Sequence, residues 1–189
     1  MSNVIEFTKY TDETAPKGAD VILAGAKKNF GFLPEPLARM AESPAIVEAF
    51  MSANGIFGKT SLTPLEREVL VMRVATGHGC EYCVAMHTGL LKKVGAADEL
   101  IEKLRSRDTL NDAHLQAMID FVDELQLTHG AVRNESLQAF LDAGYTKQQS
   151  LEVVLGISVY TMSTYANRLT KAPLDDAFEK FRWEMPSVS

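Results

Sequence analysis

The sequence lacks the features that mark nucleic-acid-binding and membrane proteins. Among its 189 residues, 19 Lys and Arg stand against 25 Asp and Glu, so the formal net charge is -6, and basic residues form no cluster. Such a chain is poorly suited to DNA, RNA or an anionic membrane surface. No apolar run approaches the roughly 20 residues that span a bilayer, and the N-terminus has no charged-then-apolar signal pattern. We therefore expect a cytoplasmic protein with no nucleic-acid or membrane partner.

Cysteine is also scarce, and its placement is informative. The chain has 2 cysteines, Cys80 and Cys83, separated by two residues. In a reducing cytosol a Cys-x-x-Cys pair is more often catalytic or metal-binding than structural. A disulfide across so short a loop would add little stability in any case. The pair therefore indicates a catalytic or metal-binding role rather than a structural one.

Strand signals are missing as well, since no useful stretch alternates between apolar and polar residues with period two. We predict an all-α fold in a single domain, residues 1–189, with residues 1–16 as an extended, poorly anchored N-terminal tail. The predicted helices are 19–30, 37–42, 44–56, 64–77, 80–94, 98–105, 112–129, 135–143, 147–172 and 175–183.

Two of these predicted helices form a hairpin around the cysteines. Thr63, Pro64 and Glu66 provide an N-cap, a first-turn proline and a capping box for the first helix. Glu68 lies on the apolar face of that helix, where a carboxylate needs a partner or a chemical role. The break at 77–79 then starts the second helix at the cysteines.

Cys80, Cys83 and His87 stand at i, i+3 and i+7 and should share one face of the second helix. Free backbone N–H groups in its first turn favour a thiolate. Cys83 and His87 then supply a nucleophile and a base one turn apart, and Glu68 can orient the base.

Less specific interpretations of these residues remain open. The cysteines could be buried and inert, Glu68 a surface acid and His87 a core histidine. Cys80, Cys83 and His87 could also bind a metal together with His78 or Glu68. All three motif ligands would then lie on one short helix, unlike most metal sites, so we expect neither a metal nor a cofactor.

The longest helix, 147–172, places seven residues in register on one face, and we expect it to be packed on several sides. These residues are Leu151, Val154, Leu155, Ser158, Met162, Tyr165 and Leu169. His114 and His129 lie near the start and the end of other helices, and we interpret both as structural.

The pattern Glu-x11-Cys-x-x-Cys-x3-His is met at Glu68, Cys80, Cys83 and His87. It resembles the alkylhydroperoxidase D (AhpD) branch of the carboxymuconolactone decarboxylase superfamily, in its peroxidase-related members. The motif matches best over residues 62–91. The resemblance implies an AhpD-like helical bundle built around the hairpin that carries Cys-x-x-Cys.

The same resemblance implies an antioxidant oxidoreductase, a thiol-dependent peroxidase. Cys83 would be the peroxidatic cysteine and Cys80 its resolving partner, with Glu68 and His87 as a proton relay. Tyr82 stands where well-known members have a second histidine, and its hydroxyl could orient a water or peroxide. Implied partners are a hydroperoxide, a thioredoxin-like or lipoyl dithiol reductant, and further copies of the chain in a dimer, trimer or hexamer.

Two other functions are compatible with the sequence. One is a carboxymuconolactone decarboxylase-like enzyme, although those relatives need not carry the dithiol. The other is a non-enzymatic redox sensor or oligomeric interaction protein. In such a protein, formation of the disulfide changes how the helices or subunits pack and does not form part of a catalytic cycle.

Overall fold

The computed structural model describes residues 5–185, which are all-α and contain no strand. The elements are α1 (Ala19–Phe30), α2 (Glu35–Met40), α3 (Pro44–Phe57), α4 (Pro64–Gly77), α5 (Glu81–Lys93), α6 (Asp98–Ser106), α7 (Ala113–Leu127), α8 (Asn134–Asp142), α9 (Lys147–Leu169) and the 3-10 helix η1 (Asp176–Phe181). The predicted fold class is confirmed, and most helix ends fall within two residues of the predicted ones.

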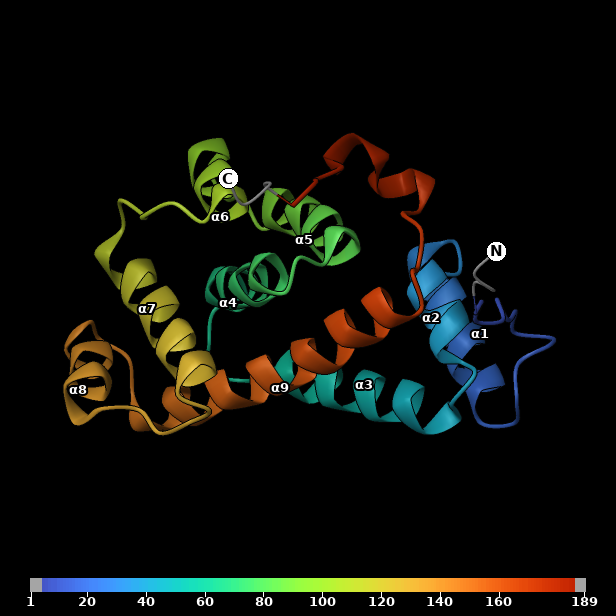
Figure 1. Cartoon of the computed structure of the whole chain (residues 1–189), viewed down its shortest axis with the longest axis horizontal. Helices are drawn as coiled ribbons and strands as arrows, with labels where there is room; N and C mark the ends of the chain where they lie inside the picture. The colour runs from blue at the N-terminus through green and yellow to red at the C-terminus, as the bar shows by residue number, and fades with distance from the viewer. Residues whose placement is uncertain (1–4, 186–189) are drawn as a thin grey trace.

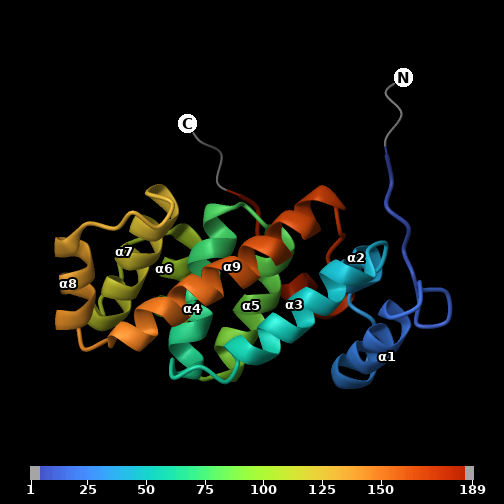
Figure 2. The ribbon, with the colours of Figure 1, turned by 90° about the horizontal axis from the view of Figure 1, so that it is seen from below.

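Helix α4 is the centre of the bundle. It packs against α5, α6, α7 and α9, which surround it in two perpendicular views (Figures 1 and 2). Its consecutive residues Val69, Leu70, Val71 and Met72 are all at most 1% exposed. A helix that is apolar around most of its circumference is stable only when neighbours cover it on several sides. The site described below starts from this central helix.

A second, smaller core joins α1, α2 and α3 at one end of the molecule (Figure 1), where Leu23, Met40 and Val47 pack against one another. The N-terminal segment is fixed to this core. The Tyr10 N–H donates to the Ala38 carbonyl at 3.0 Å. The prediction that residues 1–16 are poorly anchored was therefore wrong for its described part, while residues 1–4 lie outside the described residues.

The α4–α5 hairpin forms as its turn residues predict. The Thr63 side chain and the Glu66 side chain complete a capping box at the start of α4. Gly79 adopts φ +62° between the two helices, a conformation that glycine accepts without a steric cost. Cys80 is the N-cap of α5, and its N–H donates to the Ala75 carbonyl at 3.0 Å. This turn holds the cysteines against the end of α4.

Helix α9 packs against α2, α3, α4 and α7, so the prediction that it is packed on several sides is confirmed, but the face that packs differs from the predicted one. Four residues of the predicted packing face are exposed: Leu151 (72%), Val154 (43%), Tyr165 (60%) and Leu169 (69%). The face that points inward combines apolar residues with small and polar ones; its buried residues are Val153, Gly156, Val159, Tyr160, Ser163, Thr164, Ala166 and Asn167. A Cβ atom at Gly156 would lie 2.7 Å from the Phe57 ring, so glycine permits the close packing of α9 on α3 and α4. Apolar spacing alone therefore identified the wrong side of this helix.

The C-terminal segment returns to the bundle beside α5. Trp183 is 8% exposed, and its indole N–H donates to the Arg105 carbonyl at 3.2 Å. Phe181 packs on Gly89, where a Cβ atom would lie 2.9 Å from the ring. These two contacts dock the C-terminal segment on α5 and α6. Within residues 5–185, none of the helices combines the length and apolar character of a membrane span.

Candidate active site

The dithiol lies where α5 begins, and both cysteines are 1% exposed. A hydrogen bond joins the Cys80 and Cys83 Sγ atoms, which are 3.0 Å apart. A disulfide bond needs about 2.05 Å, so a shift of about 1 Å closes it. The cysteines are free in this structure, and their predicted proximity is confirmed.

The two thiols differ in acidity because they share one hydrogen bond. That bond lowers the pKa of Cys80 below its ordinary value of 9.0, against the opposing effect of burial, and the Arg168 charge acts in the same direction. The same hydrogen bond, together with burial, raises the pKa of Cys83 well above 9.0. The first proton is therefore lost from Cys80, and Cys83 retains its own.

Glu68 and His87 form the predicted pair. The His87 Nδ1 and Glu68 Oε2 atoms are 2.7 Å apart, and their side chains are 1% and 16% exposed. The His87 Nε2 atom is buried and has no partner among the described residues. The ring packs edge-on against Tyr160, with centroids 5.1 Å apart. An oriented imidazole with one open nitrogen thus lies one helical turn after Cys83.

Helix α9 supplies residues that sequence analysis missed. The Asn167 amide donates from Nδ2 to the Cys83 Sγ at 3.2 Å, and the Ser163 side chain also acts to lower the Cys83 pKa. Asn167 and Ser163 are 4% and 6% exposed. The available signal was the run of polar residues Ser163, Thr164 and Asn167 at helical spacing within an apolar helix.

Tyr82 is engaged away from the sulfurs. Its hydroxyl donates to the Asp175 carboxylate at 2.6 Å, and burial with this acidic neighbour raises the Tyr82 pKa. Burial also raises the pKa of Asp175, which accepts the Glu35 backbone N–H at 3.2 Å. Through Asp175, Tyr82 therefore connects α5 to the C-terminal segment and to α2. That the Tyr82 hydroxyl orients a water or a peroxide stays a prediction.

A cavity of about 350 Å³ adjoins the dithiol. Its lining residues are Gly79, Cys80, Glu81, Tyr82, Asn167, Arg168, Lys171 and Ala172. Cys80 lines this cavity and Cys83 does not. Small molecules therefore meet the Cys80 side of the pair.

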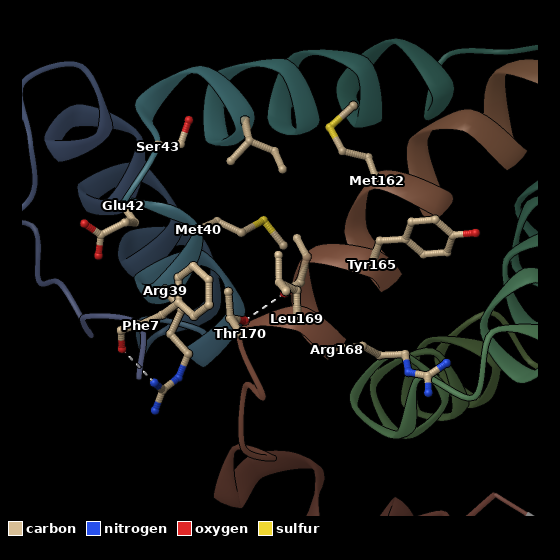
Figure 3. A pocket seen from close by; sticks show the side chains of 12 residues that line it. Phe7, Arg39, Met40, Glu42, Ser43, Met162, Tyr165, Arg168, Leu169 and Thr170 are labelled. Atoms are coloured by element: carbon tan, nitrogen blue, oxygen red, sulfur yellow. Dashed lines mark hydrogen bonds between the residues drawn. The ribbon is translucent and has the colours of Figure 1, made fainter. Parts of the chain in front are cut away.

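A larger cavity, about 800 Å³, lies between the C-terminal half of α9 and the segment that joins α2 to α3 (Figure 3). Met40, Met162 and Leu169 give it an apolar lining. In Figure 3, Arg168 extends away from these apolar side chains, and it lines both cavities. The larger cavity contains neither cysteine and neither member of the Glu68–His87 pair.

His78 has partners of its own. His78 Nδ1 lies 2.8 Å from the Thr164 hydroxyl oxygen, and its Nε2 lies 3.1 Å from the Gln126 amide nitrogen. Within residues 5–185, no group of three or more His, Cys, Asp or Glu side chains is arranged to hold a metal ion.

Residues 44–118 match the family described as the Carboxymuconolactone decarboxylase family. The match covers the end of the N-terminal core, the whole α4–α5 hairpin and the start of α7. No curated protein matches the sequence closely enough to count as a relative.

Solved structures share the fold over nearly the whole chain. One is the alkylhydroperoxidase AhpD core of a peroxidase-related protein from Ralstonia eutropha JMP134, with a TM-score of 0.81 and 17% identity, covering 94% of this chain and 96% of that one. A peroxidase-related protein from Silicibacter sp. TM1040 has a TM-score of 0.77 and 18% identity, with coverages of 96% and 100%.

The debrominase Bmp8, in complex with 2,3,4-tribromopyrrole, has a TM-score of 0.73 and 15% identity, covering 96% of this chain and 97% of that one. At these identities the comparisons establish the fold, and the predicted AhpD-like helical fold is confirmed.

Proposed function

We propose that the protein is a thiol-dependent peroxidase that reduces hydroperoxides with the Cys80–Cys83 pair. One arrangement carries the proposal: two sulfurs lie 3.0 Å apart, and one helical turn after Cys83 stands His87, which is paired with Glu68 and has an open Nε2 atom. Peroxide reduction requires a thiolate, a second thiol within reach of it, and a group that moves a proton between them. These three requirements meet at the start of α5.

The reaction has two steps. A thiolate sulfur attacks the terminal oxygen of R–O–O–H, so that an S–O bond forms and the O–O bond breaks. The alkoxide takes back the proton that the thiol lost on ionising, which gives ROH and a sulfenic acid. The second thiol then attacks the sulfenic sulfur, and an S–S bond forms. The hydroxide leaves with the second thiol's proton as water.

The order of the two sulfurs is a separate question. The sequence prediction has Cys83 attacking and Cys80 resolving, and it stays a prediction. Two observations favour the reverse order: Cys80 lines the cavity, and its pKa is lowered while that of Cys83 is raised. We therefore propose that Cys80 attacks the peroxide. His87 then takes the proton of Cys83, through a water, as Cys83 attacks the sulfenic acid.

An external dithiol, thioredoxin-like or lipoyl, completes the cycle in this proposal. One of its thiolates attacks Cys80, the sulfur that faces the cavity, and Cys83 leaves and takes up a proton. The second thiol of the reductant then attacks its own sulfur in this mixed disulfide, which releases Cys80 and leaves the reductant as a disulfide. We also propose that the chain forms a homo-oligomer. The exposed apolar residues of α9, among them Leu151, Tyr165 and Leu169, support this, because isolated chains seldom leave large apolar patches in water.

Reductive dehalogenation is a second candidate, favoured by the fold shared with the debrominase Bmp8. A dithiol supplies the same two electrons in both reactions. Two thiols and one C–Br bond give a C–H bond, HBr and a disulfide. The cavity beside Cys80, about 350 Å³, has room for a small halogenated ring.

The test is steady-state reduction of hydroperoxides and of 2,3,4-tribromopyrrole with dithiothreitol as the recycling dithiol. We expect hydroperoxide turnover by the wild type, and loss of it in Cys80→Ser and in Cys83→Ser. Protein treated with a chelator should be equally active. Full hydroperoxide turnover by both cysteine variants would overturn the proposal, and turnover of the bromopyrrole alone would support the second candidate.

Sulfenic acid trapping decides the order. Each single-cysteine variant is treated with one equivalent of hydroperoxide and a dimedone probe. If Cys80 attacks, Cys83→Ser gives the labelled product and Cys80→Ser does not. The opposite pattern would establish the order predicted from the sequence.

A further inference from the structure

The cavity beside Cys80 contains a buried polar group with an unused oxygen. Asn167 is 4% exposed, and its Nδ2 atom lies 3.2 Å from the Cys83 Sγ and 4.0 Å from the Cys80 Sγ. Its Oδ1 atom has no hydrogen-bond partner among residues 5–185. A buried acceptor without a donor costs about 1–3 kcal/mol. Because Asn167 lines the cavity, a ligand there can provide the missing donor.

The charge around this cavity is opposite in sign to that of the whole chain. Arg168 and Lys171 line it, and neither has a carboxylate within ion-pair distance among the described residues. Glu81 contributes one negative charge, and the N-terminus of α5 adds partial positive charge. The Arg168 charge already acts on the Cys80 thiolate. The cavity is therefore locally cationic in a chain with a net charge of -6.

We propose that this cavity binds a small hydroperoxide that also carries a carboxylate. The peroxide O–H donates to the Asn167 Oδ1 atom. This hydrogen bond directs the terminal oxygen of the hydroperoxide toward the Cys80 sulfur. The carboxylate lies against Arg168 and Lys171. This inference names a substrate class for the peroxidase proposed above and rests on that function. It assigns Asn167 to substrate orientation and the two cations to selection of the anion.

A hydrogen-bond donor and an anionic group are both required by this geometry. A plain carboxylate would satisfy the cations but cannot donate to Asn167 when it is ionised. A neutral alkyl hydroperoxide can donate to Asn167 but makes no use of the positive charge. A molecule with both groups satisfies Asn167, Arg168 and Lys171 together.

The kinetic test compares cumene hydroperoxide with its para-carboxylate derivative, two molecules that differ only in the anionic group. We expect the wild type to prefer the carboxylate by about tenfold in kcat/KM at low salt, mainly through KM, and less at high salt. Lys171→Glu should abolish or invert the preference. The matched control is Lys147→Glu, which makes the same charge change at an exposed lysine at the start of α9, far along the helix from the cavity, and it should leave the preference unchanged.

Asn167 is tested with two isosteric variants. Asn167→Asp keeps an acceptor but removes the amide donor near the sulfurs, so the thiolate should form at higher pH in an ultraviolet absorbance titration. Asn167→Leu removes both groups and should raise KM for both hydroperoxides. If Asn167 were purely structural, both variants would be less stable, but their KM values and thiolate titrations would match those of the wild type. That result would overturn the assignment of Asn167.

An alkylation test separates this inference from the peroxidase proposal. Reduced protein is treated with iodoacetate or with iodoacetamide, which differ in charge and need no peroxidase activity. The ratio of the two alkylation rates should favour iodoacetate in the wild type more than in Lys171→Glu. Equal ratios in the two proteins would overturn the cationic subsite even if hydroperoxides are reduced. A changed ratio without any hydroperoxide turnover would keep the anion subsite and overturn the peroxidase function and the substrate class that rests on it.

Discussion

Two glutamate–histidine pairs start from α4, and only one of them is placed for chemistry. Glu68–His87 and Glu66–His114 each have an oxygen and a nitrogen atom 2.7 Å apart. His114 uses both ring nitrogens, since its Nδ1 lies 2.7 Å from the Ala143 carbonyl oxygen. Its ring also stacks on Tyr145 with centroids 4.0 Å apart. His87 leaves Nε2 without a partner, inside the core. The open nitrogen and the nearby sulfurs, rather than the acid–imidazole pair, distinguish a relay from a structural contact.

The largest difference between the two pairs should appear in hydroperoxide turnover when each histidine is replaced by glutamine. His87→Gln removes the group that moves the Cys83 proton, so hydroperoxide turnover should fall by about 100-fold. His114→Gln should keep turnover within about twofold of the wild type, because it lies away from the sulfurs. Steady-state rates with one reductant measure both variants. Equal losses in the two would show that the pairs act only through stability.

The two glutamates provide a second matched test. Glu68→Gln removes the carboxylate whose contact orients His87, and turnover should fall by about tenfold. Glu66→Gln keeps the capping interaction with Thr63, because glutamine serves equally well in a capping box, and should not alter turnover. The pH profile of kcat should change for Glu68→Gln alone, and an unchanged profile would remove Glu68 from the relay.

The Glu66–His114 pair should make the free energy of unfolding depend on pH. Burial works against both charges. The hydrogen bond with Glu66 nevertheless raises the pKa of His114 above 6.5, and the bonds from His114 and Thr63 lower the pKa of Glu66 below 4.5. The His114 contribution is full below pH 6.5 and is lost as the pH rises through its folded-state pKa. The Glu66 contribution is full above pH 4.5 and is lost as the pH falls through its folded-state pKa.

Together these shifts mean that the pair stabilises the fold most between the ordinary pKa values of Glu66 and His114, 4.5 and 6.5. We expect Glu66→Gln to lower the free energy of unfolding by about 1 kcal/mol near pH 5.5 and by less than half of that near pH 8.5. Urea unfolding of wild type and variant at both pH values measures this difference. A cost that does not change with pH would mean that the pair is not ionised.

The smallest effects should come from the aromatic rings beside the two histidines. Tyr145 donates its hydroxyl to the His114 carbonyl at 3.2 Å, and Tyr160 donates to the Asn54 side-chain oxygen at 3.0 Å. Neither hydroxyl bonds to a sulfur or to an imidazole nitrogen, so Tyr145→Phe and Tyr160→Phe should each cost about 1 kcal/mol or less. Denaturant midpoints measure the cost. A large loss of turnover in Tyr160→Phe would add its hydroxyl to the relay.

Local signals predicted much of this molecule. Helix α1 has its predicted bounds, Ala19–Phe30, with Gly31 at its end, and the capping box of α4 is present as expected. The four motif residues could also be found from the sequence, because three lie on one helix and the fourth on the helix before it. Their spacing therefore fixes which of them share a face.

The rest depends on contacts between distant segments. Asn167 lies more than eighty residues from the cysteines, and no local spacing connects them. The apolar spacing of α9 favoured the face that carries Leu151 and Leu169, yet that face is exposed in the single chain. Gly156 and Asn167 turn inward because α9 must approach α3 and α4 closely and must offer a polar group to the sulfurs. Helical periodicity alone contains neither requirement.

The position of Trp183 has a practical consequence. It is the single tryptophan of the chain, and it is held between the C-terminal segment and the end of α6. Its fluorescence is therefore an intrinsic optical reporter of whether that segment is docked, readable without a dye or a label. Because Tyr82 and Asp175 connect the same segment to the first turn of α5, emission recorded during oxidation and reduction follows how far a change at the sulfurs spreads through the molecule.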